Sequence, residues 1–335
     1  MAKNVTVVGA GSWGTALAQV LCDNQNNVKL YDLNQEIVDD INQNHRNSRF
    51  FADVQLPVGL VATTNLTEAL KDAQIILLSV PTKVIRDVLK TINEQLDHAV
   101  MIINASKGIE PGTHKRVSEI VAEEIDQTYL EAFVALSGPS HAEEVIERAL
   151  TTVTCAATVA DKANEIQKMF NNEYFRVYRV DDLIGVEIGG SIKNVIALAA
   201  GIIAGLGYGD NPKAALITRG LVEIKRLGAA VVAKEETFSG LSGLGDLIVT
   251  CTSVHSRNWQ AGYKIGSGSN LQEAIDSMTM VVEGVRTCQA TYEMAQALQI
   301  EMPIVETVYE VIFNKLDPRV AIAQLMTREM KPEFY

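Results

Sequence analysis

Lys193 is the side chain in this sequence best suited to exchange a proton with a bound substrate. It lies in the run GGSIKN at residues 189–194, and helical spacing puts the two glycines and the lysine on one face. Small residues there would let another backbone or a flat ligand approach closely. A lysine with the ordinary pKa of about 10.4 is a poor base at neutral pH, but burial beside the apolar residues that follow would lower that pKa. The alternative is a structural lysine that pairs with Glu187 or extends into solvent.

A second group of polar residues follows a glycine-rich run at residues 240–245. Asp246 comes directly after that run. Further on, Ser256, Arg257 and Asn258 place two neutral side chains around a guanidinium, a group that binds phosphate through two parallel hydrogen bonds. The alternative is a helix N-cap followed by a solvated arginine. The run falls one residue short of G-x-S-x-G, since Leu244 replaces the last glycine and no strand precedes it, so we exclude a serine hydrolase.

The remaining reactive side chains are interpreted as structural. His141 and His255 border these loops, but a lone histidine is more often structural, so neither is assigned to catalysis. The acidic pairs at residues 123–124 and 143–144 are expected to be solvated helix faces. The four cysteines are far apart and form no C-x-x-C, which predicts structural thiols in a reducing compartment and no metal site.

The N-terminal stretch predicts the cofactor. An apolar strand at residues 4–8 breaks into G-x-G-x-x-G at residues 9–14, and a helix should follow. Such glycines allow a tight turn, a close approach of the backbone to a pyrophosphate, and packing of the helix on the strand. A second strand ends at Asp32, 18 residues after Gly14, where a carboxylate can bind a ribose. The full pattern predicts a dinucleotide site.

Alternating strands and helices continue to about residue 180. Apolar strands at 74–80, 99–103 and 133–136, with helices at 84–95 and 115–124, predict a parallel sheet with helices on both faces. Residues 46–62 should be an irregular connection. A strand pair at 152–156 and 175–180 should complete the sheet around a helix at 161–170. The loops after the strands, which carry Lys107 and Ser140 among others, should converge with the glycine turn on one crevice.

The periodicity is helical almost throughout from Leu183 onward. The expected helices span residues 184–207, 212–230, 271–277, 285–298, 304–313 and 318–326. We therefore expect an α/β dinucleotide-binding domain at residues 1–182, a Rossmann-like doubly wound parallel sheet, followed by an all-α substrate domain at residues 183–335.

Composition narrows the partners. The chain has 335 residues and a formal net charge of −12, which argues against nucleic acid or an anionic membrane as a partner. A small anionic substrate remains compatible if cations gather locally. The most membrane-like run, residues 195–206, is too short to span a bilayer, so stable membrane insertion is not expected. Without a secretory signal, we expect a cytoplasmic protein, and the apolar helical half could support a homodimer.

Six motifs in order resemble the bacterial NAD(P)-dependent sn-glycerol-3-phosphate dehydrogenases, and the resemblance covers nearly the whole chain. The motifs are GAGSWGTA at residues 9–16, SKG at 106–108, SGPS at 137–140, GGSIKN at 189–194, GLGDL at 243–247 and HSRN at 255–258, followed by VEG at 282–284.

The resemblance implies reduction of dihydroxyacetone phosphate to sn-glycerol 3-phosphate by NAD(P)H, in support of glycerophospholipid synthesis, with Lys193 as the acid/base. It implies that Asp246 binds the substrate and orients Lys193 or its hydroxyl partner. The implied cofactor contacts are Gly9, Gly11, Ser12, Trp13, Gly14, Asp32, Lys107, Ala142, Arg257, Val281 and Glu283. The implied substrate contacts are Lys107, Gly138, Ser140, Lys193, Asp246, Ser256, Arg257 and Asn258.

One position departs from that family. Its members commonly carry a histidine or arginine just after the second strand, suited to the 2′-phosphate of NADP, whereas this chain has Asp32, Leu33 and Asn34. A carboxylate accepts hydrogen bonds from ribose hydroxyls and repels a phosphate. We therefore expect NADH to be preferred or at least well used.

Two other functions are compatible with a dinucleotide-binding half. Another two-domain dehydrogenase, of the 3-hydroxyacid or ketopantoate type, is disfavoured by the trio at residues 256–258 and by the order of the motifs. A redox-sensing NAD-binding regulator without turnover would need no lysine at position 193.

Overall fold

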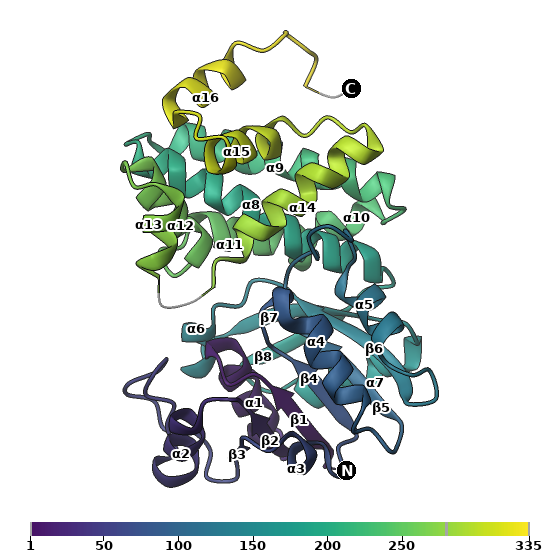
Figure 1. Ribbon diagram of the computed structural model, residues 1–335. Coiled ribbons are helices and arrows are strands. Elements are labelled where there is room, and N and C mark those ends of the chain that lie inside the picture. Colours follow the sequence, from purple (N-terminus) through teal and green to yellow (C-terminus); the bar gives the residue numbers. More distant parts are fainter. Residues whose placement is uncertain (1, 279–280, 334–335) are drawn as a thin grey trace.

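The computed structural model describes residues 2–278 and 281–333. Figure 1 shows two stacked halves: a sheet flanked by helices, which holds the N-terminus, and an all-helical half, which holds the C-terminus. The strands end with β8 (Phe175–Arg179), and the helical half begins with α8 (Leu183–Gly205). This architecture confirms the expected fold class.

Within the described residues, the strands form one sheet in the order β3-β2-β1-β4-β5-β6-β7-β8. Neighbouring strands are parallel except for β6 and β7, which are antiparallel. Every residue of β4 and β5 is buried, as expected for strands covered on both faces. The strands that precede β8 are β1 (Asn4–Val8), β2 (Asn27–Tyr31), β3 (Val61–Thr63), β4 (Ile75–Leu78), β5 (Val100–Asn104), β6 (Leu130–Ser137) and β7 (Thr151–Ala157).

Helices cover both faces of this sheet (Figure 1). The strand–turn–helix at the N-terminus forms as expected: Gly9 has a φ of 105°, and a Cβ on Gly14 would lie 1.9 Å from the carbonyl oxygen of Gly9. The helices of this half are α1 (Ser12–Asp23), α2 (Gln35–Asn44), α3 (Leu66–Leu70), α4 (Thr82–Asn93), α5 (Val117–Glu124), α6 (Ala142–Ile146) and α7 (Ala160–Phe170).

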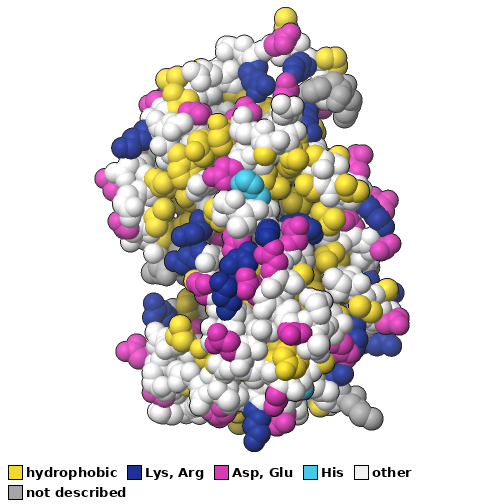
Figure 2. All heavy atoms as spheres, turned by 45° about the vertical axis from the view of Figure 1, so that its right-hand side comes forward, with side chains coloured by type: hydrophobic (Ala, Val, Ile, Leu, Met, Phe, Trp, Pro, Cys, Tyr) yellow, Lys and Arg dark blue, Asp and Glu magenta, His cyan; other side chains and the backbone are white. Residues whose placement is uncertain are grey.

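Some details of the sheet half differ from expectation. The edge strand β3 and the helix α3, of three and five residues, are too short to leave a periodic pattern and were not predicted. β7 runs antiparallel because residues 138–150 hold only the five-residue α6, and a parallel crossover needs a longer element. Glu123 is exposed as expected, but Glu124 is partly buried, and Arg86 of α4 pairs with both carboxylates. Figure 2 shows such oppositely charged side chains intermingled where the two halves meet.

The helical half is built around α8. By length and composition α8 could cross a membrane, but 83% of its most apolar window is buried inside the protein, as in the core helix of a globular domain. The other helices are α9 (Asp210–Ala230), α10 (Glu235–Phe238), the π-helical turn η1 (Leu241–Gly245), α11 (Asp246–Thr252), α12 (Arg257–Gly266), α13 (Leu271–Asp276), α14 (Glu283–Leu298), α15 (Pro303–Phe313) and α16 (Pro318–Met326).

Backbones of α8 and α12 pack directly on each other through glycines. A Cβ on Gly201 would lie 2.0 Å from the carbonyl oxygen of Trp259, and one on Gly262 would lie 2.1 Å from that of Leu198. Neither helix can therefore accept a side chain at these points. The contact fixes the end of α8 relative to α12, which begins at Arg257.

Replacing Gly262 with alanine should force α8 and α12 apart, because the new methyl group would overlap backbone. Overpacking of this kind costs about 1–3 kcal/mol, so the urea midpoint of unfolding should fall. Gly59→Ala is the control, since a Cβ there meets nothing within 4 Å, and its midpoint should stay close to that of the wild type. A Gly262→Ala protein as stable as the wild type would contradict the close packing.

Candidate active site

A cavity of about 370 Å³ opens at the carboxyl edge of the sheet, between the two halves. It is lined by the start of α1, by the loops after β4, β5 and β6, and by residues of α8, α11, α12 and α14. The predicted site residues that line it are Gly11, Ser12, Trp13, Lys107, Ser140, Ala142, Lys193, Asp246, Ser256, Arg257, Asn258, Val281 and Glu283. Those outside the lining are Gly9, Gly14, Asp32 and Gly138.

The start of α1 fits the pyrophosphate of a dinucleotide. Gly11 is its N-cap, no side chain caps the helix, and a Cβ on Gly11 would meet nothing within 4 Å. The helix therefore presents its positive end and backbone N–H groups to open space at the cavity wall, the arrangement that binds phosphate.

Asp32 supports this turn from behind. Its Oδ2 accepts a hydrogen bond from the backbone N–H of Ala10 at 2.8 Å, and its Oδ1 accepts one from that of Asn34 at 2.9 Å. Each carboxylate oxygen keeps further lone pairs for a ribose hydroxyl. Asp32 thus shapes the turn as well as carrying a charge beside it.

Asp246 joins two lysines from different halves of the protein. Its Oδ1 accepts from Nζ of Lys193, on α8, and its Oδ2 accepts from Nζ of Lys107, after β5, at 2.7 Å. Lys107 also donates to the carbonyl oxygen of Gly138 at 3.0 Å, which is how Gly138 contributes from outside the lining. Lys193 and Asp246 are only 5% and 1% exposed, so the group is a buried ion cluster at the cavity wall.

This environment shifts the pKa values of Lys193 and Asp246. Burial lowers the pKa of Lys193, Asp246 opposes that shift, and the charge of Lys107 adds to it, so that the pKa lies at about 8. Burial acts to raise the pKa of Asp246, but the ammonium groups of Lys107 and Lys193 outweigh it and hold that pKa below its usual range. The cluster therefore pairs a carboxylate that stays ionised with a lysine that can release its proton near neutral pH.

The interpretation of Lys193 as a structural lysine that pairs with Glu187 or extends into solvent is wrong. Glu187 does not pair with it; the Glu187 carboxylate accepts hydrogen bonds from Arg116 and from the backbone and hydroxyl of Ser118. Nor does Lys193 reach solvent. Its second partner is the hydroxyl of Thr250, at 2.8 Å.

The trio at residues 256–258 is partly a helix cap. Ser256 caps α12 by accepting from the backbone N–H of Trp259, as the alternative interpretation held. Arg257, however, lines the cavity, and burial lowers its pKa while the charges of Glu143 and Glu283 raise it. Asn258 bonds Asn194 of α8 at 2.9 Å and the backbone N–H of Gly284 at 2.8 Å.

Glu283 ties α14 to the sheet half. Its carboxylate accepts from the backbone N–H of Thr82 at 3.0 Å and from the Thr82 hydroxyl at 3.1 Å, at the start of α4. Burial raises the pKa of Glu283, and the hydrogen bonds from Thr82 oppose that shift. The contact joins α14 to the start of α4 at the cavity wall, which Glu283 lines.

Several residues of the site are not among those expected from the sequence. Thr250 lies one turn after Asp246 on α11, a spacing that identifies it once a helix is recognised there; the helices expected from the sequence leave the segment between residues 230 and 271 without one. Asn194 follows Lys193 directly. His141 and His255 both line the cavity, with ring centroids 6.0 Å apart, and Glu143 lines it rather than facing solvent.

Comparisons with known proteins agree with this geometry. Family models described as NAD-dependent glycerol-3-phosphate dehydrogenase N-terminus and C-terminus match residues 4–163 and 182–323. Glycerol-3-phosphate dehydrogenase (NAD(P)+) of Bacillus cereus (strain B4264) is 54% identical over 98% of this chain and 97% of the relative.

Solved structures give the same result. A glycerol-3-phosphate dehydrogenase from Coxiella burnetii is 36% identical with a TM-score of 0.93, covering 98% of this chain and 99% of that one. Another, from Saccharomyces cerevisiae, is 27% identical with a TM-score of 0.82, covering 97% and 99%. The cavity, the phosphate turn and these matches together show that the chain belongs to the family of NAD-dependent glycerol-3-phosphate dehydrogenases.

Proposed function

We propose that this protein reversibly reduces dihydroxyacetone phosphate to sn-glycerol 3-phosphate, with Lys193 as the acid that protonates the carbonyl oxygen. The reduced dinucleotide supplies the hydride when bound. The observation that carries the proposal is the buried Lys193–Asp246 pair, which lines the same cavity as Arg257 and the uncapped start of α1. One small cavity thus presents an acid, a phosphate-binding guanidinium and a pyrophosphate site.

Each predicted residue has a role that its position supports. The guanidinium of Arg257 and the polar groups of Ser256 and Asn258 hold the phosphate region of the substrate. Asp246 orients Lys193 through its carboxylate and contacts the substrate, together with Lys107, Gly138 and Ser140. The residues proposed to hold the cofactor, two of which also contact the substrate, are Gly9, Gly11, Ser12, Trp13, Gly14, Asp32, Lys107, Ala142, Arg257, Val281 and Glu283.

Asp246 and Thr250 hold Lys193 in place before and after the proposed proton transfer. When the carbonyl oxygen takes the proton of Lys193, the amine stays bound to Asp246 and to the Thr250 hydroxyl. Thr250 itself donates to the backbone carbonyl of Asp246 at 2.6 Å, so its lone pairs face the lysine. In the oxidation direction the neutral amine accepts the hydroxyl proton of the substrate.

We also propose the wider setting expected from the sequence: a dinucleotide domain at residues 1–182, a substrate domain at 183–335, a cytoplasmic location without membrane insertion, and a role in supplying glycerophospholipid synthesis. The hydrophobic side chains on the surface of the helical half (Figure 2) support association into a homodimer. Light scattering after gel filtration tests that association.

The direct test of the function is the loss of NADH absorbance when dihydroxyacetone phosphate is added. Oxidation of NADH that depends on this substrate, and not on a 3-oxoacid or ketopantoate, is the expected result. A protein that binds NADH but oxidises none of it with any of these substrates would be a sensor rather than an enzyme, and the proposal would fail.

Lys193→Ala should lower kcat by about 10²- to 10⁴-fold, the usual contribution of a general acid. The affinity for NADH, measured by fluorescence titration, should stay close to that of the wild type. Lys213→Ala, which removes a lysine paired with exposed Asp210, is the control and should leave both constants unchanged. Retained turnover in the Lys193 variant would remove this residue from its role.

The two directions of the reaction should respond oppositely to pH. Reduction needs Lys193 protonated, so its kcat/KM should fall as pH rises through about 8, where burial places the lysine pKa. Oxidation needs the neutral amine and should rise over the same range. Initial rates from pH 6.5 to 9.5 check this, and parallel pH profiles for the two directions would argue for a different acid.

Asp32 should favour NADH over NADPH, because its carboxylate repels the 2′-phosphate. Asp32→Asn keeps an acceptor for the N–H of Ala10 but removes the charge, so it should lower the NADH-to-NADPH ratio of kcat/KM. Any damage to the turn acts on both cofactors and cancels in that ratio. A wild-type enzyme that strongly prefers NADPH would disprove the proposed preference for NADH.

A further inference from the structure

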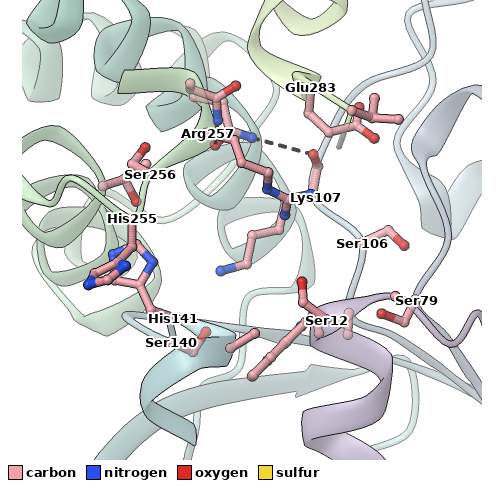
Figure 3. Close-up of a pocket in the computed structure, with 18 of the residues that line it drawn as sticks. Ser12, Ser79, Ser106, Lys107, Ser140, His141, His255, Ser256, Arg257 and Glu283 are labelled. Atoms are coloured by element: carbon pink, nitrogen blue, oxygen red, sulfur yellow. Dashed lines mark hydrogen bonds between the residues drawn. The ribbon is translucent and has the colours of Figure 1, made fainter. Parts of the chain in front are cut away.

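Two histidines that the proposed mechanism does not use meet at the cavity. His141 lies in the loop after β6, next to Ser140, and His255 lies in the link between α11 and α12, next to Ser256. Their ring centroids are 6.0 Å apart at an interplanar angle of 56°. Figure 3 shows the pair between Ser140 and Ser256, on the opposite side of the cavity from Ser79 and Ser106.

His141 is held in an environment that disfavours its charge. Burial lowers its pKa, and the charge of Lys193 lowers it further, against smaller opposing effects of Glu143, Glu144 and a hydrogen bond to the backbone of Val249. Its Nε2 is buried and has no hydrogen-bond partner among the described residues. Such a nitrogen is costly to leave unpaired, and His141 lines the cavity, so its ring is available to a ligand bound there.

The charged side chains that line the cavity show why an anionic ligand needs an additional positive group there. Among the described residues that line it, the three cations Lys107, Lys193 and Arg257 are matched by three acidic side chains, Asp246, Glu143 and Glu283. Asp246 is bound directly to both lysines. A doubly charged phosphate therefore enters a site that has no net positive charge while the imidazoles are neutral.

We propose that His141 and His255 form a second phosphate-binding element, which takes up a proton as the phosphoryl group of the substrate binds. This inference rests on the proposed function and extends its phosphate site beyond Arg257.

The electrostatics support proton uptake on binding. Opposite charges within about 4–6 Å favour the charged form of a titrating group, so the phosphate opposes the burial and the Lys193 charge that keep His141 neutral. The charged groups that act on His141 are Lys193 on α8 and Glu143 and Glu144 on α6. Arg257, at the start of α12, lines the same cavity. None of the acidic groups is hydrogen-bonded to either ring in the described structure, which leaves the rings to the ligand.

Calorimetry measures the uptake directly. Glycerol 3-phosphate is titrated at pH 7.5 into NADH-loaded enzyme, a pair that cannot react because both partners are already reduced. Repeating the titration in buffers of different ionisation enthalpy gives the number of protons bound. We expect uptake approaching about one proton per site in the wild type, and almost none in the His141→Gln/His255→Gln double variant, with a Kd raised about tenfold or more.

His98→Gln is the matched control, because His98 lies outside the cavity beside Asp97, and its proton count should equal that of the wild type. The single variants, checked for folding by NADH binding, should each lose part of the uptake. As a second measurement, the imidazole signals of wild-type enzyme should show a histidine pKa that rises on addition of glycerol 3-phosphate.

Two results would overturn the inference while leaving the proposed function intact: a wild-type enzyme that reduces dihydroxyacetone phosphate but binds glycerol 3-phosphate without proton uptake, or a double variant whose uptake is unchanged. Failure of the wild type to oxidise NADH with dihydroxyacetone phosphate would instead overturn the function itself.

Discussion

A single buried carboxylate organises this molecule. Asp246 is held between Lys107, which follows a strand of the sheet, and Lys193, which lies in the central helix of the other half. Removing Asp246 would leave two ammonium groups without a counter-charge in a buried site, a change that is strongly destabilising. The same contacts keep Asp246 ionised and let burial bring the pKa of Lys193 to about 8. The proposed proton transfer therefore depends on how the two halves are joined.

That junction repeats one physical device. Besides Asp246, the helical half sends Glu283 to the first residue of α4 and Glu187 to the first turn of α5, where each carboxylate accepts a backbone N–H. Helix N-termini attract negative charge, so the acidic side chains dock on positive ends of the sheet half. These contacts set the width of the cavity, while the glycine packing of α8 on α12 sets the position of Lys193 relative to Arg257.

The sequence predicted the parts of the fold and site that depend on local pattern. The glycine turn, the buried strands and the long α8 follow from spacing and apolar periodicity. The strand β3 and the helix α3 are too short to leave a detectable pattern. The antiparallel direction of β7 follows from the connection between β6 and β7, which holds only the short helix α6. Thr250 and the pairing of His141 with His255 depend on tertiary contact between segments far apart in the chain, which periodicity does not encode. The helix α11 is not expected from the sequence because a glycine-rich run precedes it. In the structure that run forms a π-helical turn whose backbone packs against Gly189.

The central claim is that Asp246 acts through Lys193, and a double-mutant cycle on kcat/KM for dihydroxyacetone phosphate tests it most directly. Residues that work as one unit give losses that are far from additive. Asp246→Asn should cost much activity in the wild-type background and little once Lys193 is alanine. If the two losses instead add in full, the carboxylate and the lysine act independently, and the account given for this site is wrong.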